Sequence, residues 1–75
     1  MKFNITNSAR LEILNRFLPE VELAMYEEII RCEFDPDTFD PSSFEPELNN
    51  ENHAKLAPLC ARYNIISAKI LEAKG

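Results

Sequence analysis

Residues 34–46 read FDPDTFDPSSFEP, from Phe34 to Pro46, and repeat an aromatic residue, an acid and a proline at intervals of five residues. This period matches neither the 3.6-residue period of a helix nor the two-residue period of a strand. An acid followed by proline suits the first two positions of a type I turn. The stretch therefore predicts three successive turns that direct three phenylalanines to one side. The turns are expected at Asp35-Pro36, Asp40-Pro41 and Glu45-Pro46.

The phenylalanines of this stretch, Phe34, Phe39 and Phe44, allow two outcomes. Burial of one phenylalanine contributes about 1.5–3 kcal/mol, whereas fixing five backbone residues costs on the order of 5–10 kcal/mol. Proline and the turn hydrogen bonds reduce this deficit. The rings either strap the loop across the helices or are partly held for a partner. Because the chain has five phenylalanines and no tryptophan, its core is short of large side chains and we expect the strap.

The segment before this loop predicts two helices with a boundary at Pro19. Leu11, Leu14 and Leu18 have helical spacing, and Thr6, Asn7 and Ser8 before them are all plausible N-caps. We expect the first helix over about residues 7–17. Pro19 ends it and opens a second helix, over about residues 19–33, because the missing N–H has no cost in a first turn.

The expected second helix is amphipathic. Leu23, Tyr26 and Ile30 fall on one stripe, with Met25, Ile29 and Cys32 beside it, and we assign this apolar face to the core. Acids and one arginine gather on the opposite side and predict an acidic outer face. These outer residues are Glu20, Glu27, Glu28 and Arg31.

A third helix is expected over about residues 50–73. Its apolar residues recur at alternating spacings of three and four, as in a coiled-coil seam, and are Leu56, Leu59, Tyr63, Ile66 and Ile70. Pro58 predicts a kink or break after a short first turn. The sequence thus predicts an all-α bundle of three main helices in a single domain, residues 1–75, with a Pro/Phe-rich acidic loop over 34–49.

Composition restricts the environment of the chain. The 75 residues carry a net charge of −5, and eleven of the thirteen acids lie between Glu20 and Glu51. The bases are too few and too scattered to favour direct nucleic-acid binding. No apolar run reaches the roughly 18–20 residues that span a bilayer, and the N-terminus lacks the apolar region of a secretory signal. We expect a cytoplasmic protein that does not bind membranes.

The sequence contains no catalytic signature. The acids at Asp35, Asp37 and Asp40 do not fit a calcium loop, because the twelfth position from Asp35 is Pro46. Cys32 and Cys60 are too far apart for a zinc-ligand pair and read as small buried thiols. A Cys-His dyad between Cys60 and His53 requires hydrogen-bond contact, and Pro58 separates the two. We expect no enzyme activity, no metal and no cofactor.

Three bases recur every seven residues beside the seam of the last helix: Lys55, Arg62 and Lys69. Such flanking bases pair with acids on a neighbouring helix. The pairing is either within the chain, with Glu27, Glu28 or the acidic loop, or with another chain. Ile65 lies between Arg62 and Lys69 on a face that should be polar, and an apolar residue framed by bases also resembles the centre of a small interface.

These features together predict a small acidic, non-enzymatic protein that acts by protein–protein interaction, as a binding or regulatory module. The expected partner is another protein, for which a basic surface is one candidate, and a homodimer is also open. The alternatives are a nucleic-acid mimic that inhibits a DNA-binding protein, and a homo-oligomeric structural or accessory subunit of an enzyme. The candidate partner-binding residues are Arg62, Ile65, Lys69, Glu27, Glu28, Asp35, Asp37, Asp40, Phe39 and Phe44.

Overall fold

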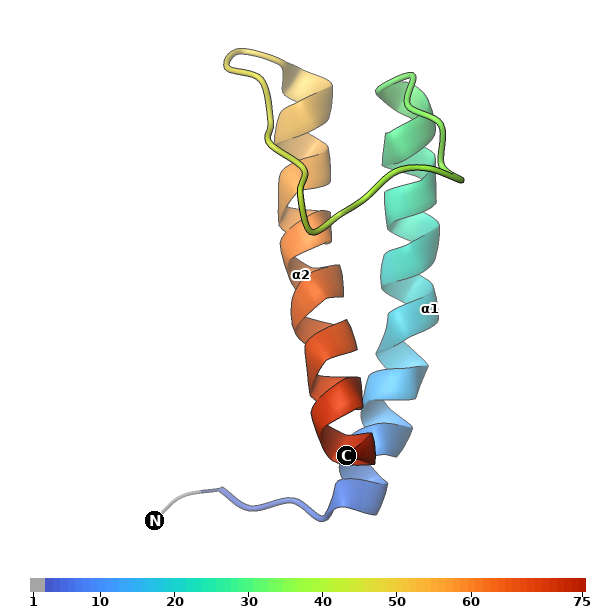
Figure 1. Ribbon diagram of the computed structural model, residues 1–75, viewed down its shortest axis with the longest axis vertical. Helices are drawn as coiled ribbons and strands as arrows, with labels where there is room; N and C mark the ends of the chain where they lie inside the picture. Colours follow the sequence, from blue (N-terminus) through green and yellow to red (C-terminus); the bar gives the residue numbers. More distant parts are fainter. Residues whose placement is uncertain (1–2) are drawn as a thin grey trace.

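The computed structural model describes residues 3–75, which form an all-α hairpin of two antiparallel helices (Figure 1). Helix α1 spans Asn7–Arg31 and helix α2 spans Glu51–Lys74. The connection between them crosses one side of both helices and returns to the start of α2. The all-α expectation is confirmed. The expectation of three helices is wrong, because two of the expected helices are one.

Helix α1 continues through Pro19, where a boundary was expected. A proline inside a helix removes one backbone hydrogen bond and costs about 3 kcal/mol. Pro19 and Asn15, whose carbonyl loses its partner, are both exposed, so water can hydrate that carbonyl. Leu14, Leu18 and Val21 all lie on the buried or half-buried side of α1. Only an unbroken helix keeps these three side chains on one face.

Helix α2 likewise runs through Pro58, without a sharp bend (Figure 1), so the expected break is wrong. Pro58 and Ala54, four residues earlier, are exposed. Leu56 and Cys60, on either side of the proline in sequence, are both buried in the same cluster. Their spacing of four residues places them on one face only if the helix is continuous.

Polar side chains cap the N-terminal ends of both helices. Thr6 Oγ1 accepts a hydrogen bond from the Ala9 N–H at 3.3 Å, as expected for an N-cap. Asn50 Oδ1 accepts one from the His53 N–H at 3.1 Å and fixes the start of α2 at Glu51.

The C-terminal end of α1 closes in a Schellman motif. The Phe34 N–H donates to the Ile29 carbonyl at 3.1 Å, and the Glu33 N–H donates to the Ile30 carbonyl at 2.9 Å. Glu33 takes the left-handed conformation that this motif requires, with a φ of 63°. The motif turns the chain back, so that Phe34 starts the loop against the helices.

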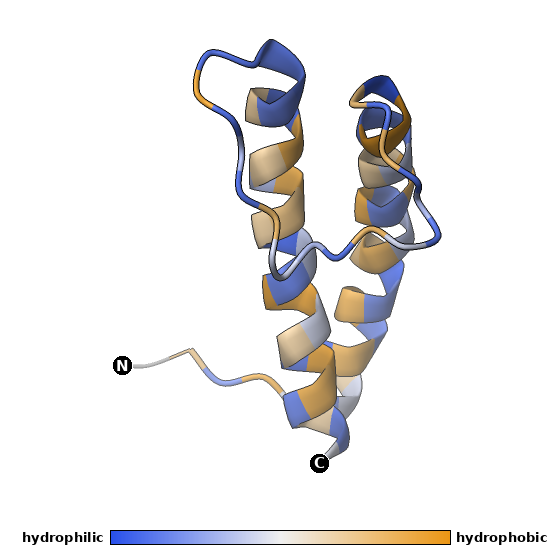
Figure 2. Cartoon of the chain, turned by 45° about the horizontal axis from the view of Figure 1, so that its top comes forward, coloured by the Kyte–Doolittle hydropathy of each residue, from blue (hydrophilic) through white to orange (hydrophobic). Residues whose placement is uncertain are grey.

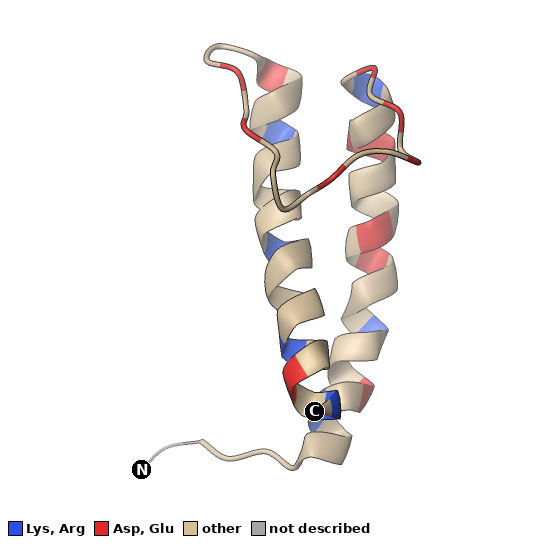
Figure 3. Ribbon diagram, in the orientation of Figure 1, with Lys and Arg blue, Asp and Glu red and all other residues tan. Residues whose placement is uncertain are grey.

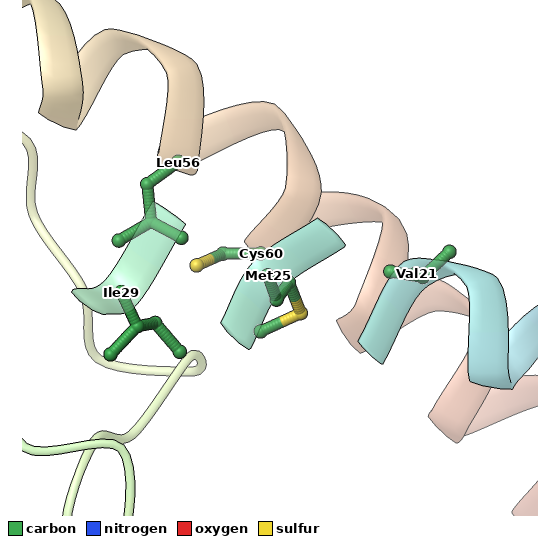
Figure 4. Close-up of a cluster of buried hydrophobic side chains, with 5 residues drawn as sticks. All are labelled: Val21, Met25, Ile29, Leu56 and Cys60. Atoms are coloured by element: carbon green, nitrogen blue, oxygen red, sulfur yellow. The ribbon is translucent and has the colours of Figure 1, made fainter. Parts of the chain in front are cut away.

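The core lies where the loop covers the hairpin. Val21, Met25 and Ile29 of α1 pack against Leu56 and Cys60 of α2 (Figure 4). The expected apolar face of α1 is therefore confirmed only in part: Met25 and Ile29, expected beside the stripe, are buried. The expected stripe is exposed: Leu23 by 74%, Tyr26 by 57% and Ile30 by 50%.

The molecule is elongated. Its radius of gyration is 14.3 Å, against about 11 Å for a compact chain of this length, and its extents are 42 × 27 × 18 Å. Hydrophobic residues occur along the full length of both helices (Figure 2), whereas the main buried cluster occupies only the end near the loop.

Neither helix, within the described residues, combines the length and the apolarity that a membrane crossing requires.

Candidate interaction surfaces

The loop is attached to the helices by an aromatic cluster. The Phe34 ring centroid lies 5.6 Å from that of Phe39 and 6.0 Å from that of Phe44, and Phe39 and Phe44 are 5.5 Å apart. His53 of α2 contacts Phe34 and Phe44, each at 5.4 Å. All three phenylalanines are half-buried and pack against the core. The expected strap is confirmed. A role of Phe39 and Phe44 in partner binding stays a prediction.

Two of the three expected turns are present. Asp35 Oδ1 accepts from the Asp37 N–H at 2.9 Å, and the Thr38 N–H donates to the Asp35 carbonyl at 3.2 Å. Asp40 repeats the pattern with Ser42 at 3.0 Å and Ser43 at 3.3 Å. In both turns the aspartate side chain binds the backbone N–H two residues ahead, as in an Asx turn.

The third turn is not at Glu45-Pro46, where it was expected. A glutamate is one methylene longer than an aspartate and does not form the short Asx ring. The chain instead turns over residues 47–50, where the Asn50 N–H donates to the Glu47 carbonyl at 3.3 Å. The Glu47 N–H donates to His53 Nδ1 at 3.0 Å, which ties this end of the loop to α2.

The carboxylates of the loop face solvent. Hydrogen bonds from the Ser42 side chain and backbone, with a further one from Ser43, hold the pKa of the Asp40 carboxyl below its usual value. The loop acids and several acids of α1 form a negative surface, while bases are spaced along α2 (Figure 3). The exposed loop acids are Asp35, Asp37, Asp40, Glu45 and Glu47.

The ion pairs of the described residues all lie within a single helix. Arg31 binds Glu27 at 2.7 Å and Glu28 at 3.4 Å, and Lys69 binds Glu72 at 3.4 Å. The expected pairing of the α2 bases with Glu27, Glu28 or the loop is therefore wrong. Within residues 3–75, Lys55 and Arg62 have no acid in ion-pair range, which leaves their charges available for another chain.

Arg62 and Ile65 lie at a shallow hollow of about 280 Å³ that both helices line. Its other lining residues are Leu14, Phe17 and Ile66. Ile65 is 61% exposed and Phe17 is 44% exposed. Lys69 follows Ile65 by one helical turn, so the three residues predicted on α2 share one surface. The acids predicted on the loop lie elsewhere, with the loop on its own side of the hairpin.

The outer face of α1 carries an apolar stripe that the sequence placed in the core. Leu23, Tyr26 and Ile30 are spaced at i, i+3 and i+7, so they lie along one side of the helix. Glu22 flanks the stripe on one side and Glu27 on the other, since each is about 60–80° from its centre at 100° per residue. We name Leu23, Tyr26 and Ile30 the outer stripe.

The titratable core groups offer little reactivity. Burial, with a smaller effect of Cys32, raises the pKa of the Cys60 thiol, and burial followed by the charge of Glu28 raises that of Cys32. Both thiols are therefore protonated near neutral pH. His53 and Cys60 are seven residues apart on one continuous helix, or about 10 Å along its axis, too far for a hydrogen bond. No group of three or more metal-ligating side chains gathers among the described residues.

Comparisons with protein-family models, with curated proteins and with solved structures found no match to this chain.

Proposed function

We propose that this chain is a non-enzymatic binding module that holds another protein on the outer stripe of α1. The support for this function is the exposure of Leu23, Tyr26 and Ile30 at the spacing by which helices contact partners. A contiguous apolar stripe of this kind marks an interaction surface more often than isolated exposed residues do.

The charges beside the stripe indicate the chemistry of the partner. Glu22 and Glu27 flank the stripe, and the loop adds the exposed carboxylates of Asp35, Asp37 and Asp40. A negative rim accelerates encounter with a positive surface and makes the encounter dependent on salt. The partner that fits is a basic amphipathic helix, with its apolar side on the stripe and its bases on the rim.

Affinity capture with matched variants tests this function. The immobilised chain, Leu23→Ser/Ile30→Ser and the control Leu71→Ser are exposed to the same cell lysate at low salt. Leu71 is 73% exposed, like Leu23, but lies on α2. We expect the wild type and Leu71→Ser to retain a protein with a basic segment, and salt to elute it. Leu23→Ser/Ile30→Ser should not retain this protein.

Two results would contradict the proposal. Equal retention by the double variant would exclude the outer stripe as the binding surface. Recovery of DNA-binding proteins that DNA displaces, with no effect of Leu23→Ser/Ile30→Ser, would instead support the nucleic-acid mimic.

A further inference from the structure

The hairpin has one covered side and one open side. Loop residues Pro36, Phe39 and Pro41 line a hollow together with Met25 and Tyr63. The Asn64 side chain also donates to the Pro41 carbonyl at 3.1 Å. The loop thus covers one side of both helices, as Figure 1 shows. We name the opposite side the back face.

The back face has an apolar centre. At 100° per residue, the buried stripe of α2 separates two sets of side chains. Asn64, which binds the loop, is on one side of this stripe, and Leu59 and Ile66 are on the other side. On α1, Glu22 lines the hollow beneath the loop, on one side of the buried stripe. Phe17 and Ala24 are on the other side of that stripe. All four of these apolar residues are half-buried or exposed. They recur every seven residues, as the contact positions of a helical bundle do. Glu28, whose side chain is 13% exposed, lies between Ala24 and the buried stripe on the same side of α1.

Opposite charges line the two outer edges of the back face. Glu20 and Glu27 lie beside Phe17 and Ala24 on the edge of α1. Arg16 and Arg31 flank these two acids on the same edge, and Arg31 pairs with Glu27 within the helix. Lys55, Arg62 and Lys69 lie beside Leu59 and Ile66 on the edge of α2. Since no ion pair within the described chain joins the two helices, these edges do not neutralise each other within one hairpin.

The register of the hairpin sets the acids and bases at matching heights. The Asn52 side chain donates to the Arg31 carbonyl at 3.5 Å, and Phe17 shares a hollow with Ile66. Counting inward from both contacts along antiparallel helices puts Ala24 level with Leu59. The same count puts Lys55 within one residue of the height of Glu27, and Arg62 within one residue of the height of Glu20.

We propose that the back face binds a second copy of this chain, with the twofold axis parallel to the helices, to form a four-helix bundle. This axis places α1 of one copy over α2 of the other at unchanged heights. Glu27 then faces Lys55 of the second copy, and Glu20 faces its Arg62. Phe17 and Ala24 meet Ile66 and Leu59. A twofold axis across the helices would instead stack acids on acids and bases on bases, which the charge pattern disfavours.

The size of the core supports the second copy. A chain of about this length gains only modest stability from a single core, and oligomerisation is one way to bury more apolar surface. The main buried cluster here is five residues at one end of an elongated hairpin. This inference goes beyond the proposed function, because it concerns the face across the hairpin from the loop rather than the outer stripe.

Charge exchange tests the proposed dimer. Light scattering on the pure full-length chain should give twice the mass of one chain. Glu20→Lys/Glu27→Lys makes both edges basic, and Lys55→Glu/Arg62→Glu makes both acidic. We expect each variant alone to dimerise about 100-fold more weakly than wild type, and a mixture of the two to form a heterodimer. Circular dichroism of each variant checks that it is folded.

The control Glu45→Lys/Glu47→Lys makes the same charge change on the exposed loop and should leave the dimer intact. A monomeric wild type, or variants that dimerise as well as wild type, would overturn the proposal. If each variant is monomeric and the mixture also stays monomeric, the edges do not pair and the proposal is equally wrong.

Cross-linking tests the orientation of the two copies. Under mild oxidation, Glu27→Cys mixed with Lys55→Cys should give a covalent dimer, with the wild type as the baseline for Cys32 and Cys60. A covalent dimer of Glu27→Cys alone would indicate α1 over α1 and overturn this arrangement. Glu27 also belongs to the rim of the outer stripe, so partner capture is compared with Lys55→Glu/Arg62→Glu, which leaves the stripe and its rim unchanged. Loss of the dimer in that variant and loss of partner capture are separate results.

Discussion

Glu33 and Asn49 are the two non-glycine residues with positive φ in the described chain, at 63° and 65°. Each stands at a reversal of direction, Glu33 after α1 and Asn49 before α2. The left-handed conformation costs an ordinary L-residue about 1–2 kcal/mol, and asparagine less, because its side chain bonds locally. The two positions therefore store unequal strain, and Glu33 stores more.

Glu33→Gly should stabilise the protein by about 0.5–1 kcal/mol. Glycine adopts the left-handed conformation without steric cost, and this gain exceeds the added entropy of glycine in the unfolded chain. The measurement is the free energy of unfolding in urea. Asn49→Gly is the matched control and should gain less. A loss of stability in Glu33→Gly would mean that the Glu33 side chain makes a contribution larger than the strain.

Single residues also set the limit of what the sequence predicted for the loop. The acid-proline pairs correctly indicated the turns at Asp35 and Asp40, because aspartate followed by proline has a direct geometric reason to turn. The same rule was wrong for Glu45, whose longer side chain cannot close the ring. The inward direction of the three phenylalanines was predicted from the scarcity of large side chains, and the structure confirms it.

In the helices, the spacing of the apolar residues determines the fold more than the prolines do. Leu11, Leu14, Leu18, Val21 and Met25 alternate at spacings of three and four straight across Pro19. This phase is kept only by one continuous helix, and it also identifies the buried stripe. A helix that starts at Pro19 has two adjacent apolar stripes, one of them the outer stripe, and its own sequence gives no reason to bury one rather than the other. The sequence does not rank the candidate partner surfaces, because the exposure of their side chains depends on which stripe of α1 is buried.

Pro19→Ala should stabilise the protein by about 1–3 kcal/mol, because it restores the hydrogen bond to the Asn15 carbonyl in the middle of α1. Chemical denaturation followed by circular dichroism measures the gain. Pro58→Ala, at an exposed interior position of α2, should gain by a similar amount. Pro46→Ala, outside both helices, should gain nothing. If Pro19→Ala lowered stability, α1 would need the proline, and the single-helix account of residues 7–31 would be wrong.

In the molecule as a whole, stability is distributed unevenly from one end to the other. Near the loop, two helices and the strap make three layers around the main buried cluster. Farther from the loop, the same helices are two layers, with Phe17 and Ile65 partly open to solvent. A second copy on the back face would add the missing layer there, so the proposed dimer and the strap cover different sides of the hairpin.

His53 joins these layers at the covered end, since its Nδ1 accepts the Glu47 N–H and its ring contacts Phe34 and Phe44. His53→Phe keeps the ring but leaves that N–H without its acceptor, and should cost about 1–2 kcal/mol. His53→Ala also removes the ring contacts and should cost about 1–2 kcal/mol more. Hydrogen exchange should show the loss of protection in the loop and the adjoining turns of α1 and α2. The helix turns around Leu14 and Ile70 should exchange as in the wild type, because Ile70 lies beyond Asn64, the residue of α2 that binds the loop at Pro41. Equal stability of His53→Phe and wild type would show that the Glu47 hydrogen bond does not hold the loop. If protection were instead lost evenly over both helices, the two ends of the hairpin would unfold as one unit.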